Sequence, residues 1–146
     1  MRHVAGLLCT LAVLLTTAET HAEERGLVVI VHPSRTVRLS VDDVARIFLK
    51  KQRFWDDGSP IVALNREAQS PLRETFTRRV FGLSSDALAT YWNRQYFLGV
   101  LPPATLSSSE AVKRYVASEP GAIGYIEASL ADDSVRVASK LEGAGD

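Results

Sequence analysis

The sequence predicts one α/β sandwich in which strands and helices alternate along the chain. Three observations support this prediction. Short β-branched apolar runs are interleaved with segments of helical periodicity, serine residues stand where helices would begin, and the length suits one core but not two. The composition, 46% hydrophobic and 23% charged, is typical of an ordinary globular protein.

Charge and cysteine content exclude several classes of protein. The 17 Lys and Arg residues balance the 17 Asp and Glu residues, so the formal net charge is zero. A balanced chain gives no electrostatic reason to expect nucleic acid or an anionic membrane as the main partner. The chain has one cysteine, which excludes an intrachain disulfide and a metal site built from several cysteines.

Residues 1–22 are predicted to be a cleaved secretory signal peptide. A short basic start precedes the apolar residues 4–15, a run that suits the core of a signal and is too short to cross a bilayer. A small-x-small pattern favours cleavage after Ala22, with cleavage after Ala18 as the alternative. An uncleaved anchoring segment is a further alternative. We therefore expect an exported domain over residues 23–146, with no membrane insertion after cleavage.

The first half of this domain is predicted to contain two strands and a helix. Residues 26–31 are a continuous β-branched run, typical of a strand that is buried on both faces. Ser40 and Asp43 form a capping box that starts a helix. After a turn at residues 55–60, residues 61–64 are expected to form a second buried strand. The buried stripe of the helix is expected to consist of Val41, Val44, Ala45 and Phe48.

Two further helices are predicted in the middle of the chain. Ser70 is expected to be the N-cap of the first, with Pro71 at its first helical position and Gly82 ending it. The next helix is expected over residues 85–97. The apolar and aromatic segment 96–103 follows, and it is either a packed connection or a partly exposed contact surface.

The last part of the chain is predicted to contain a helix and two strands. Ser108 or Ser109 is expected to cap the helix, which Pro120 ends. The remaining expected segments are a strand at residues 122–126, a weaker strand at residues 135–137 and a frayed tail over residues 141–146.

The residue inventory argues against an enzyme, a metal site and a bound cofactor. The expected mature chain has no cysteine and one histidine, His32, so thiol nucleophiles and multi-histidine zinc sites are excluded. No serine lies in a Gly-x-Ser-x-Gly motif, and no glycine-rich phosphate loop is present. The acidic pairs are neighbours in sequence, so their side chains point apart. His32 is expected to be a solvated loop residue.

One group of residues stands out where the second strand leads into the second helix. Ligands of open α/β sheets bind at the carboxyl ends of strands, and the first turn of a helix offers free amides and a partial positive charge. Arg66 and the Ser70 hydroxyl could hold a tetrahedral oxyanion there, with Arg73 adding charge. In the alternative interpretation Ser70 is only an N-cap, and Arg66 pairs with Glu67, Glu74 or another acid.

Several motifs, taken in order, resemble the phosphate-binding periplasmic proteins of ABC transporters. Residues 91–103 also resemble a small group of stand-alone members. The resemblance covers most of residues 27–126 and implies one lobe of a type 2 periplasmic-binding fold, with a central mixed sheet flanked by helices. The motifs are Ile47-Phe48-Leu49-Lys50, Trp55-Asp56-Asp57-Gly58, Ile61 with Arg66 and Ser70, and Gly121-Ala122-Ile123-Gly124-Tyr125-Ile126.

The resemblance implies a periplasmic, non-catalytic protein that binds phosphate or a similar small oxyanion. In those receptors an arginine is followed four residues later by Ser-Gly-Thr at a helix N-terminus, which grips the anion. Arg66 and Ser70 have this spacing, but Pro71 and Leu72 replace the glycine and the threonine. Proline removes a backbone donor, and leucine removes a hydroxyl. With one lobe only, the expected oxyanion affinity is weak, roughly micromolar to millimolar.

Two functions from different classes follow from these patterns. The first is an exported solute-binding module that holds an oxyanion through Arg66, Ser70 and Arg73. The second is an accessory or interaction protein of the cell envelope with a vestigial ligand cleft, whose partner is an envelope protein or a transporter component. Two features favour the second function. They are the presence of Pro71 and Leu72 in place of the glycine and the threonine, and the apolar segment 96–103.

Overall fold

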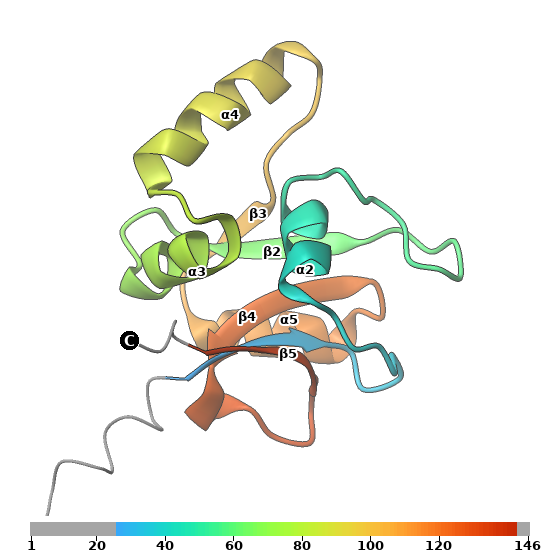
Figure 1. Ribbon diagram of the computed structural model, residues 1–146. Coiled ribbons are helices and arrows are strands. Elements are labelled where there is room, and N and C mark those ends of the chain that lie inside the picture. Colours follow the sequence, from blue (N-terminus) through green and yellow to red (C-terminus); the bar gives the residue numbers. More distant parts are fainter. Residues whose placement is uncertain (1–25, 143–146) are drawn as a thin grey trace, which may run out of the picture.

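The computed structural model describes residues 26–142 and contains a five-stranded mixed sheet with helices on both faces (Figure 1). The predicted signal peptide, residues 1–22, lies outside the described residues, as does most of the predicted tail. The elements are β1 (Leu27–Val31), α2 (Val41–Phe48), β2 (Val62–Arg66), α3 (Pro71–Phe81), α4 (Ser85–Phe97), β3 (Ala104–Leu106), α5 (Ser109–Ser118), β4 (Ala122–Glu127), the 3-10 turn η1 (Ala128–Leu130) and β5 (Arg136–Leu141).

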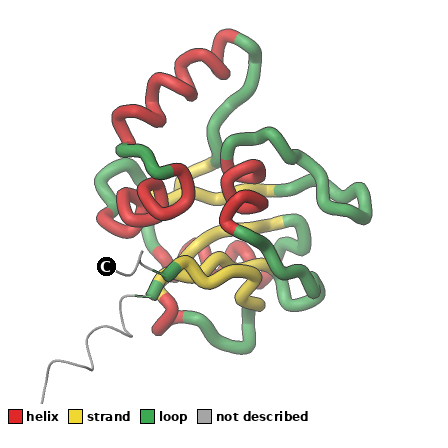
Figure 2. The backbone as a smooth tube through the Cα atoms, in the orientation of Figure 1, coloured by secondary structure: helices red, strands yellow, loops and turns green. Residues whose placement is uncertain are grey.

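The sheet has the strand order β3-β2-β4-β1-β5. β2 runs parallel to both of its neighbours, β3 and β4, whereas β1 runs antiparallel to β4 and β5. The tube view shows the strands side by side with the helices outside them (Figure 2). The expectation of a mixed sheet flanked by helices is therefore confirmed.

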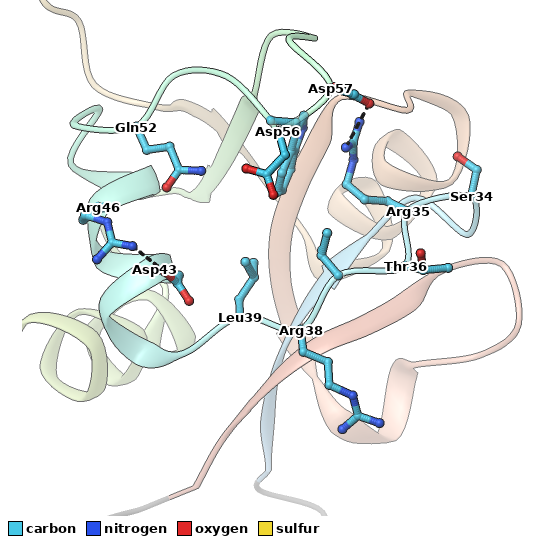
Figure 3. Close-up of a pocket in the computed structure, with 12 residues that line it drawn as sticks. Ser34, Arg35, Thr36, Arg38, Leu39, Asp43, Arg46, Gln52, Asp56 and Asp57 are labelled. Atoms are coloured by element: carbon cyan, nitrogen blue, oxygen red, sulfur yellow. Dashed lines mark hydrogen bonds and ion pairs between the residues drawn. The ribbon is translucent and has the colours of Figure 1, made fainter.

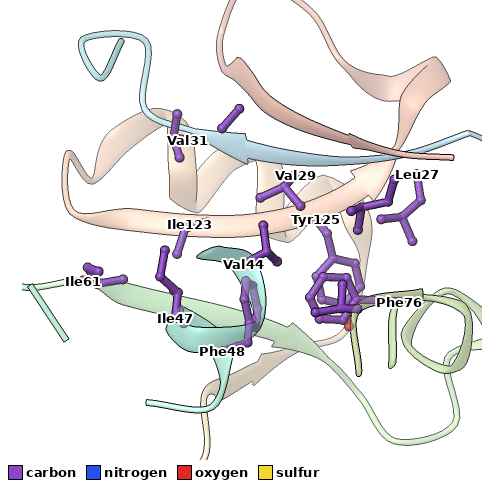
Figure 4. Packing of buried hydrophobic residues seen from close by; sticks show 14 of the residues in the cluster. Leu27, Val29, Val31, Val44, Ile47, Phe48, Ile61, Phe76, Ile123 and Tyr125 are labelled. Atoms are coloured by element: carbon purple, nitrogen blue, oxygen red, sulfur yellow. The ribbon is translucent and has the colours of Figure 1, made fainter. Parts of the chain in front are cut away.

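Alternate residues of β1 and β4 supply two separate hydrophobic cores. Val29 and Tyr125 face one core, which α2 and α3 cover, while Ile30 and Ile126 face the other, which α5 covers. All five residues of β1 are buried, as the continuous β-branched run predicts. The first core is centred on an aromatic cluster, in which the Phe76 ring stacks on the Tyr125 ring with 3.9 Å between the centroids (Figure 4).

Most predicted helix boundaries are confirmed by the hydrogen bonds that make them. Ser40 and Asp43 form the reciprocal capping box of α2. Ser70 caps α3 with Pro71 in its first turn, and Gly82 ends this helix in the left-handed conformation, at φ 64°. Of the two candidates for α5, Ser108 is the N-cap, and its hydroxyl accepts from the Ala111 amide.

The structure corrects four expectations. Val41 is 41% exposed, because it precedes the turn of α2 that packs on the sheet, and Ile47 takes its place in the buried stripe. The second strand extends to Arg66, and a short strand, β3, was not expected. The last strand continues to Leu141, which is buried opposite Leu27 and does not belong to a frayed tail.

Helix α4 contributes little to either core. Leu88 is its one buried residue, and its main packing partner among the helices is α3. Figure 1 shows α4 set apart from the sheet. The end of α4 and the connection after it leave Phe97, Leu98 and Leu101 exposed, so the packed-loop interpretation of segment 96–103 is wrong for these residues. No helix within residues 26–142 is long and apolar enough to cross a membrane.

Gly124 is where α5 approaches the sheet most closely, and its replacement by alanine should destabilise the fold. A Cβ on Gly124 would overlap the Val112 side chain, so we expect Gly124→Ala to lower the free energy of unfolding by about 1–3 kcal/mol. Val112→Ala in the same chain should relieve the overlap. The double variant should therefore lose less free energy of unfolding than the two single variants lose together. Urea denaturation of both single variants and the double variant measures this coupling, and strictly additive costs would contradict it.

Candidate functional site

The carboxyl ends of β2 and β3 lie side by side at one edge of the sheet. Arg66 is the last residue of β2 and lies opposite Leu106, the last residue of β3, in a parallel register. The chain then leaves β2 for α3 on one face of the sheet and leaves β3 for α5 on the other face. Adjacent parallel strands whose connections leave toward opposite faces form the usual ligand-binding crevice of open α/β sheets.

Strand alternation directs the Arg66 side chain toward α5. Arg66 and Leu64 are two residues apart on β2, and Leu64 packs in the core that α5 covers. The guanidinium Nη1 donates to the Ser109 hydroxyl at 2.7 Å, in the first turn of α5. Nη2 donates to the Ser107 carbonyl and to the Glu67 carboxylate, both at 3.3 Å. The buried Nε has no hydrogen-bond partner in the described part of the chain.

Ser70 and Arg73 lie on the other side of the same strand end. The Ser70 hydroxyl accepts from the Arg73 amide at 3.4 Å, and the residue is 5% exposed. The Arg73 guanidinium donates to the backbone carbonyl of Arg66 at 2.9 Å. Arg73 also lines a cavity of about 240 Å³ between α3 and α4. The first turn of α3 is therefore tied to the end of β2 by a charge-assisted hydrogen bond.

A buried polar pair holds the backbone of Arg66. Its amide donates to the Asn65 side-chain oxygen at 2.9 Å and to the Tyr125 hydroxyl at 3.2 Å, and Tyr125 in turn donates to Asn65. Burial raises the pKa of Tyr125 to about 12. The hydroxyl consequently remains protonated, and it can donate to Asn65 over the whole physiological pH range.

The structure brings Arg66, Ser70 and Arg73 together at one strand end, but it does not aim the Arg66 guanidinium at the first turn of α3. Both elements of the alternative interpretation are present, because Ser70 caps α3 and Arg66 pairs with Glu67. The Glu67 side chain is 39% exposed, whereas that of Arg66 is 11% exposed. A nearly buried cation thus has a solvent-facing acid as its partner, which an external anion could replace.

Sequence analysis missed the partners of Arg66 on α5 and β4. Ser107 and Ser109 are 41 and 43 residues away, and Tyr125 is 59 residues away. Of the three serines at residues 107–109, the sequence pattern predicts a role for Ser108 or Ser109 only, as the helix cap. The one usable signal was the polar Asn65 inside an otherwise apolar strand, because a buried amide requires partners.

A larger polar cleft of about 470 Å³ lies at the opposite end of the sheet (Figure 3). Its charged lining consists of three arginines and three aspartates, and four of these six side chains are paired within the protein. Arg35 contacts Asp57 and the Pro120 carbonyl and stacks over the Trp55 ring, while Arg46 pairs with Asp43. Because the positive and negative side chains are equal in number, the lining carries no net charge that would favour an anion.

Metal binding and histidine catalysis find no support in the described residues. Within residues 26–142, no group of three His, Asp or Glu side chains is placed to hold a metal ion. His32 lies in the loop after β1, where its ring nitrogen is 2.7 Å from the Ser34 hydroxyl. At that end of the sheet it is separated from Arg66 by the length of the strands.

Comparison with known proteins relates the chain to substrate-binding proteins. The family model described as PBP superfamily domain matches residues 24–144. The phosphate-binding protein PstS of Bacillus subtilis (strain 168) is 32% identical over 126 residues. A structure from Clostridium perfringens, described as a phosphate ABC transporter substrate-binding protein with bound phosphate, aligns with a TM-score of 0.61 at 28% identity. An ABC-type phosphate transport receptor from Vibrio cholerae shares the fold, with a TM-score of 0.62 at 20% identity.

The chain spans less than half the length of these relatives. The matches cover 81% of this chain and 36% of the B. subtilis protein, 77% and 43% for the C. perfringens structure, and 77% and 44% for the V. cholerae receptor. The resemblance is therefore to one part of phosphate ABC transporter substrate-binding proteins.

The Tyr125 hydroxyl should make the fold sensitive to alkaline pH. Its folded pKa of about 12 exceeds the ordinary value of 10, so its stabilising contribution is complete below pH 10 and is lost as the pH rises toward 12. The difference between the two pKa values corresponds to about 2–3 kcal/mol of folding free energy. Urea denaturation between pH 9 and 12 should show a steeper loss for the native chain than for Tyr125→Phe, whereas parallel curves would contradict this role.

Proposed function

Because the chain belongs to the PBP superfamily domain family, we propose that it is a non-catalytic solute-binding module. It holds a phosphate-like oxyanion in the crevice between the first turns of α3 and α5, with Arg66, Ser70 and Arg73 as its ligands. The observation that carries this proposal is the position of the Arg66 guanidinium at a switch between parallel strands, with an unused buried Nε donor.

Arg66 offers several donors to an anion without a change of backbone. Its Nε–H is unpaired, and the two contacts of Nη2, at 3.3 Å, are longer than ordinary N–H···O hydrogen bonds. Charge-assisted hydrogen bonds to an oxyanion are shorter and stronger. The guanidinium therefore gains stronger hydrogen bonds when an oxyanion replaces the two long contacts of Nη2.

Glu67 is the internal competitor for this site. Its carboxylate occupies the place of an anion next to Nη2, and its exposed side chain can turn into solvent when a ligand arrives. The ligand has to displace this acid as well as water, which lowers its net affinity. A single lobe also leaves the proposed crevice open to solvent and salt. We therefore propose weak binding, roughly in the micromolar to millimolar range.

Ser70 and Arg73 complete the anion site from α3. In the described part of the chain the Ser70 hydroxyl accepts a hydrogen bond but donates none, so its proton is available. Arg73 adds positive charge within one turn of Ser70. Pro71 contributes no amide, which is consistent with weak binding.

We also propose that residues 1–22 direct export and that the mature protein, residues 23–146, is periplasmic. The basic start and apolar run of that segment support export, and the relatives named as transporter substrate-binding proteins support the compartment. A transporter component or another envelope protein is the proposed macromolecular partner.

A second candidate is an accessory protein whose ligand crevice no longer functions. The exposure of Phe97, Leu98 and Leu101 favours it, because a monomer rarely exposes such residues together. Absence of anion binding by the native chain, together with partner capture that Arg66→Ala leaves unchanged, would identify this function.

Calorimetric titration with phosphate and with sulfate tests the anion site. Arg66→Ala should weaken binding by about tenfold to a hundredfold, because it removes at least one charge-assisted pair. Ser70→Ala should weaken it less and also cost about 1 kcal/mol of stability through the lost cap. Nanomolar binding by the monomer, or no change in Arg66→Ala, would overturn the proposal.

The Glu67→Gln variant should raise the affinity for phosphate by about threefold to tenfold, because it removes the competing charge next to Arg66. Asp56→Asn, which changes an exposed acid at the opposite end of the sheet, provides the matched control and should leave the affinity unchanged. Equal effects of the two variants would show that only the net charge matters and would contradict a role for Glu67.

A further inference from the structure

Helix α4 presents one continuous face to solvent. Asp86, Thr90, Arg94 and Phe97 are exposed and follow one another at helical spacing, three or four residues apart. Leu83 lies just before the N-cap Ser84 at the start of this helix and is 43% exposed. Within residues 26–142, neither Asp86 nor Arg94 has an ion-pair partner.

The C-terminal end of this face carries a protruding apolar knob. Phe97 is 87% exposed, Leu98 74%, Tyr96 65% and Leu101 63%. The two aromatic rings alone expose roughly 300 Å². With the two leucines the patch reaches the size, about 300–600 Å², that is often functional on a monomer.

An apolar pocket lies beside the N-terminal half of α4, next to Leu83. The cavity measures about 260 Å³ and lies between the end of α2, the end of α3 and the start of α4. Val80, Phe81, Leu83, Leu88 and Tyr91 are among its lining residues. Its volume is sufficient for a phenyl ring with part of a neighbouring leucine.

Knob and pocket are complementary to each other but cannot meet within one molecule. Leu83 and Phe97 are separated by the length of α4, about 21 Å at 1.5 Å per residue. A second copy that runs antiparallel along α4, with the two-fold axis beside Thr90, places each Phe97 next to the Leu83 of the other copy. A two-fold axis fills both pockets at once, so the assembly closes as a dimer.

We propose that α4 is the interface of a two-fold symmetric homodimer, in which Phe97 of each copy enters the apolar pocket beside Leu83 of the other. The charges on α4 support a second copy as the occupant. The antiparallel pairing that joins residues 83 and 97 also joins residues 86 and 94, so Asp86 of each copy meets Arg94 of the other. One symmetry operation thus satisfies two apolar contacts and two ion pairs.

The available area is also consistent with a dimer. A stable interface buries about 800 Å² on each partner, with an apolar centre and a polar rim. The knob, the pocket and the charged stripe between them extend along all of α4. This inference uses no residue of the proposed anion site, so each can fail without the other.

Charge exchange provides the sharpest test. Sedimentation of the full chain should show a dimer. Asp86→Arg or Arg94→Asp should raise the dissociation constant of this dimer by at least about tenfold, because each variant places like charges opposite one another. The double variant Asp86→Arg/Arg94→Asp should restore the dimer. A monomer at all concentrations, or a dimer that neither single variant weakens, would overturn the proposal.

Two further variants locate the interface on α4. Phe97→Ala should weaken the dimer by about tenfold or more, while Tyr115→Ala, which truncates an exposed aromatic ring on α5, should not. In a Cys9→Ser background, Thr90→Cys should form a disulfide-linked dimer under mild oxidation, and the exposed Asp133→Cys should not. Equal crosslinking of both variants would show that α4 is not at the two-fold axis.

Discussion

Burial of β1 and β4 on both faces is the constraint on which the rest of the structure depends. Two strands that bury side chains on both faces need a cover on each side. Helices α2 and α3 cover one face, and α5 covers the other. Gly124 permits the close approach of α5 to the sheet. The division of helices between two faces also places the proposed ligand crevice at the ends of β2 and β3.

The same alternation explains the chemistry of that crevice. Arg66 follows Leu64 on the face of α5, so its guanidinium is surrounded by the serines at the start of that helix. A cation in such a place needs an acid, and Glu67 is the nearest one. This strand end therefore combines a well-held arginine with an exposed acid as its partner. The proposed oxyanion would have to displace that acid, which is the reason for the weak proposed affinity.

Helix α4 is the helix that the rest of the described fold leaves largely uncovered. It buries one residue, whereas α2, α3 and α5 bury three residues each. Within residues 26–142, α3 is its main packing partner among the helices, and no other element packs on its exposed face. The knob, the pocket and the opposite charges on this helix make a second copy the cover that fits best.

Local patterns in the sequence determined the helices and the central strands. Ser70 with Pro71, the capping box at Ser40, and Gly82 each act through contacts within four residues, so their sequence signals predicted helix ends correctly. The five apolar residues of β1 likewise predicted a strand buried on both faces.

Only the tertiary structure decided the pairings between distant segments. β3 has three residues and exists because it lies beside β2, and β5 reaches Leu141 because Leu27 pairs with it. The direction of the Arg66 guanidinium depends on a serine 43 residues away, and the exposure of Phe97 depends on what the body does not cover. Such contacts follow from how strands align across a sheet, and the periodicity of a single segment carries no information about its neighbour.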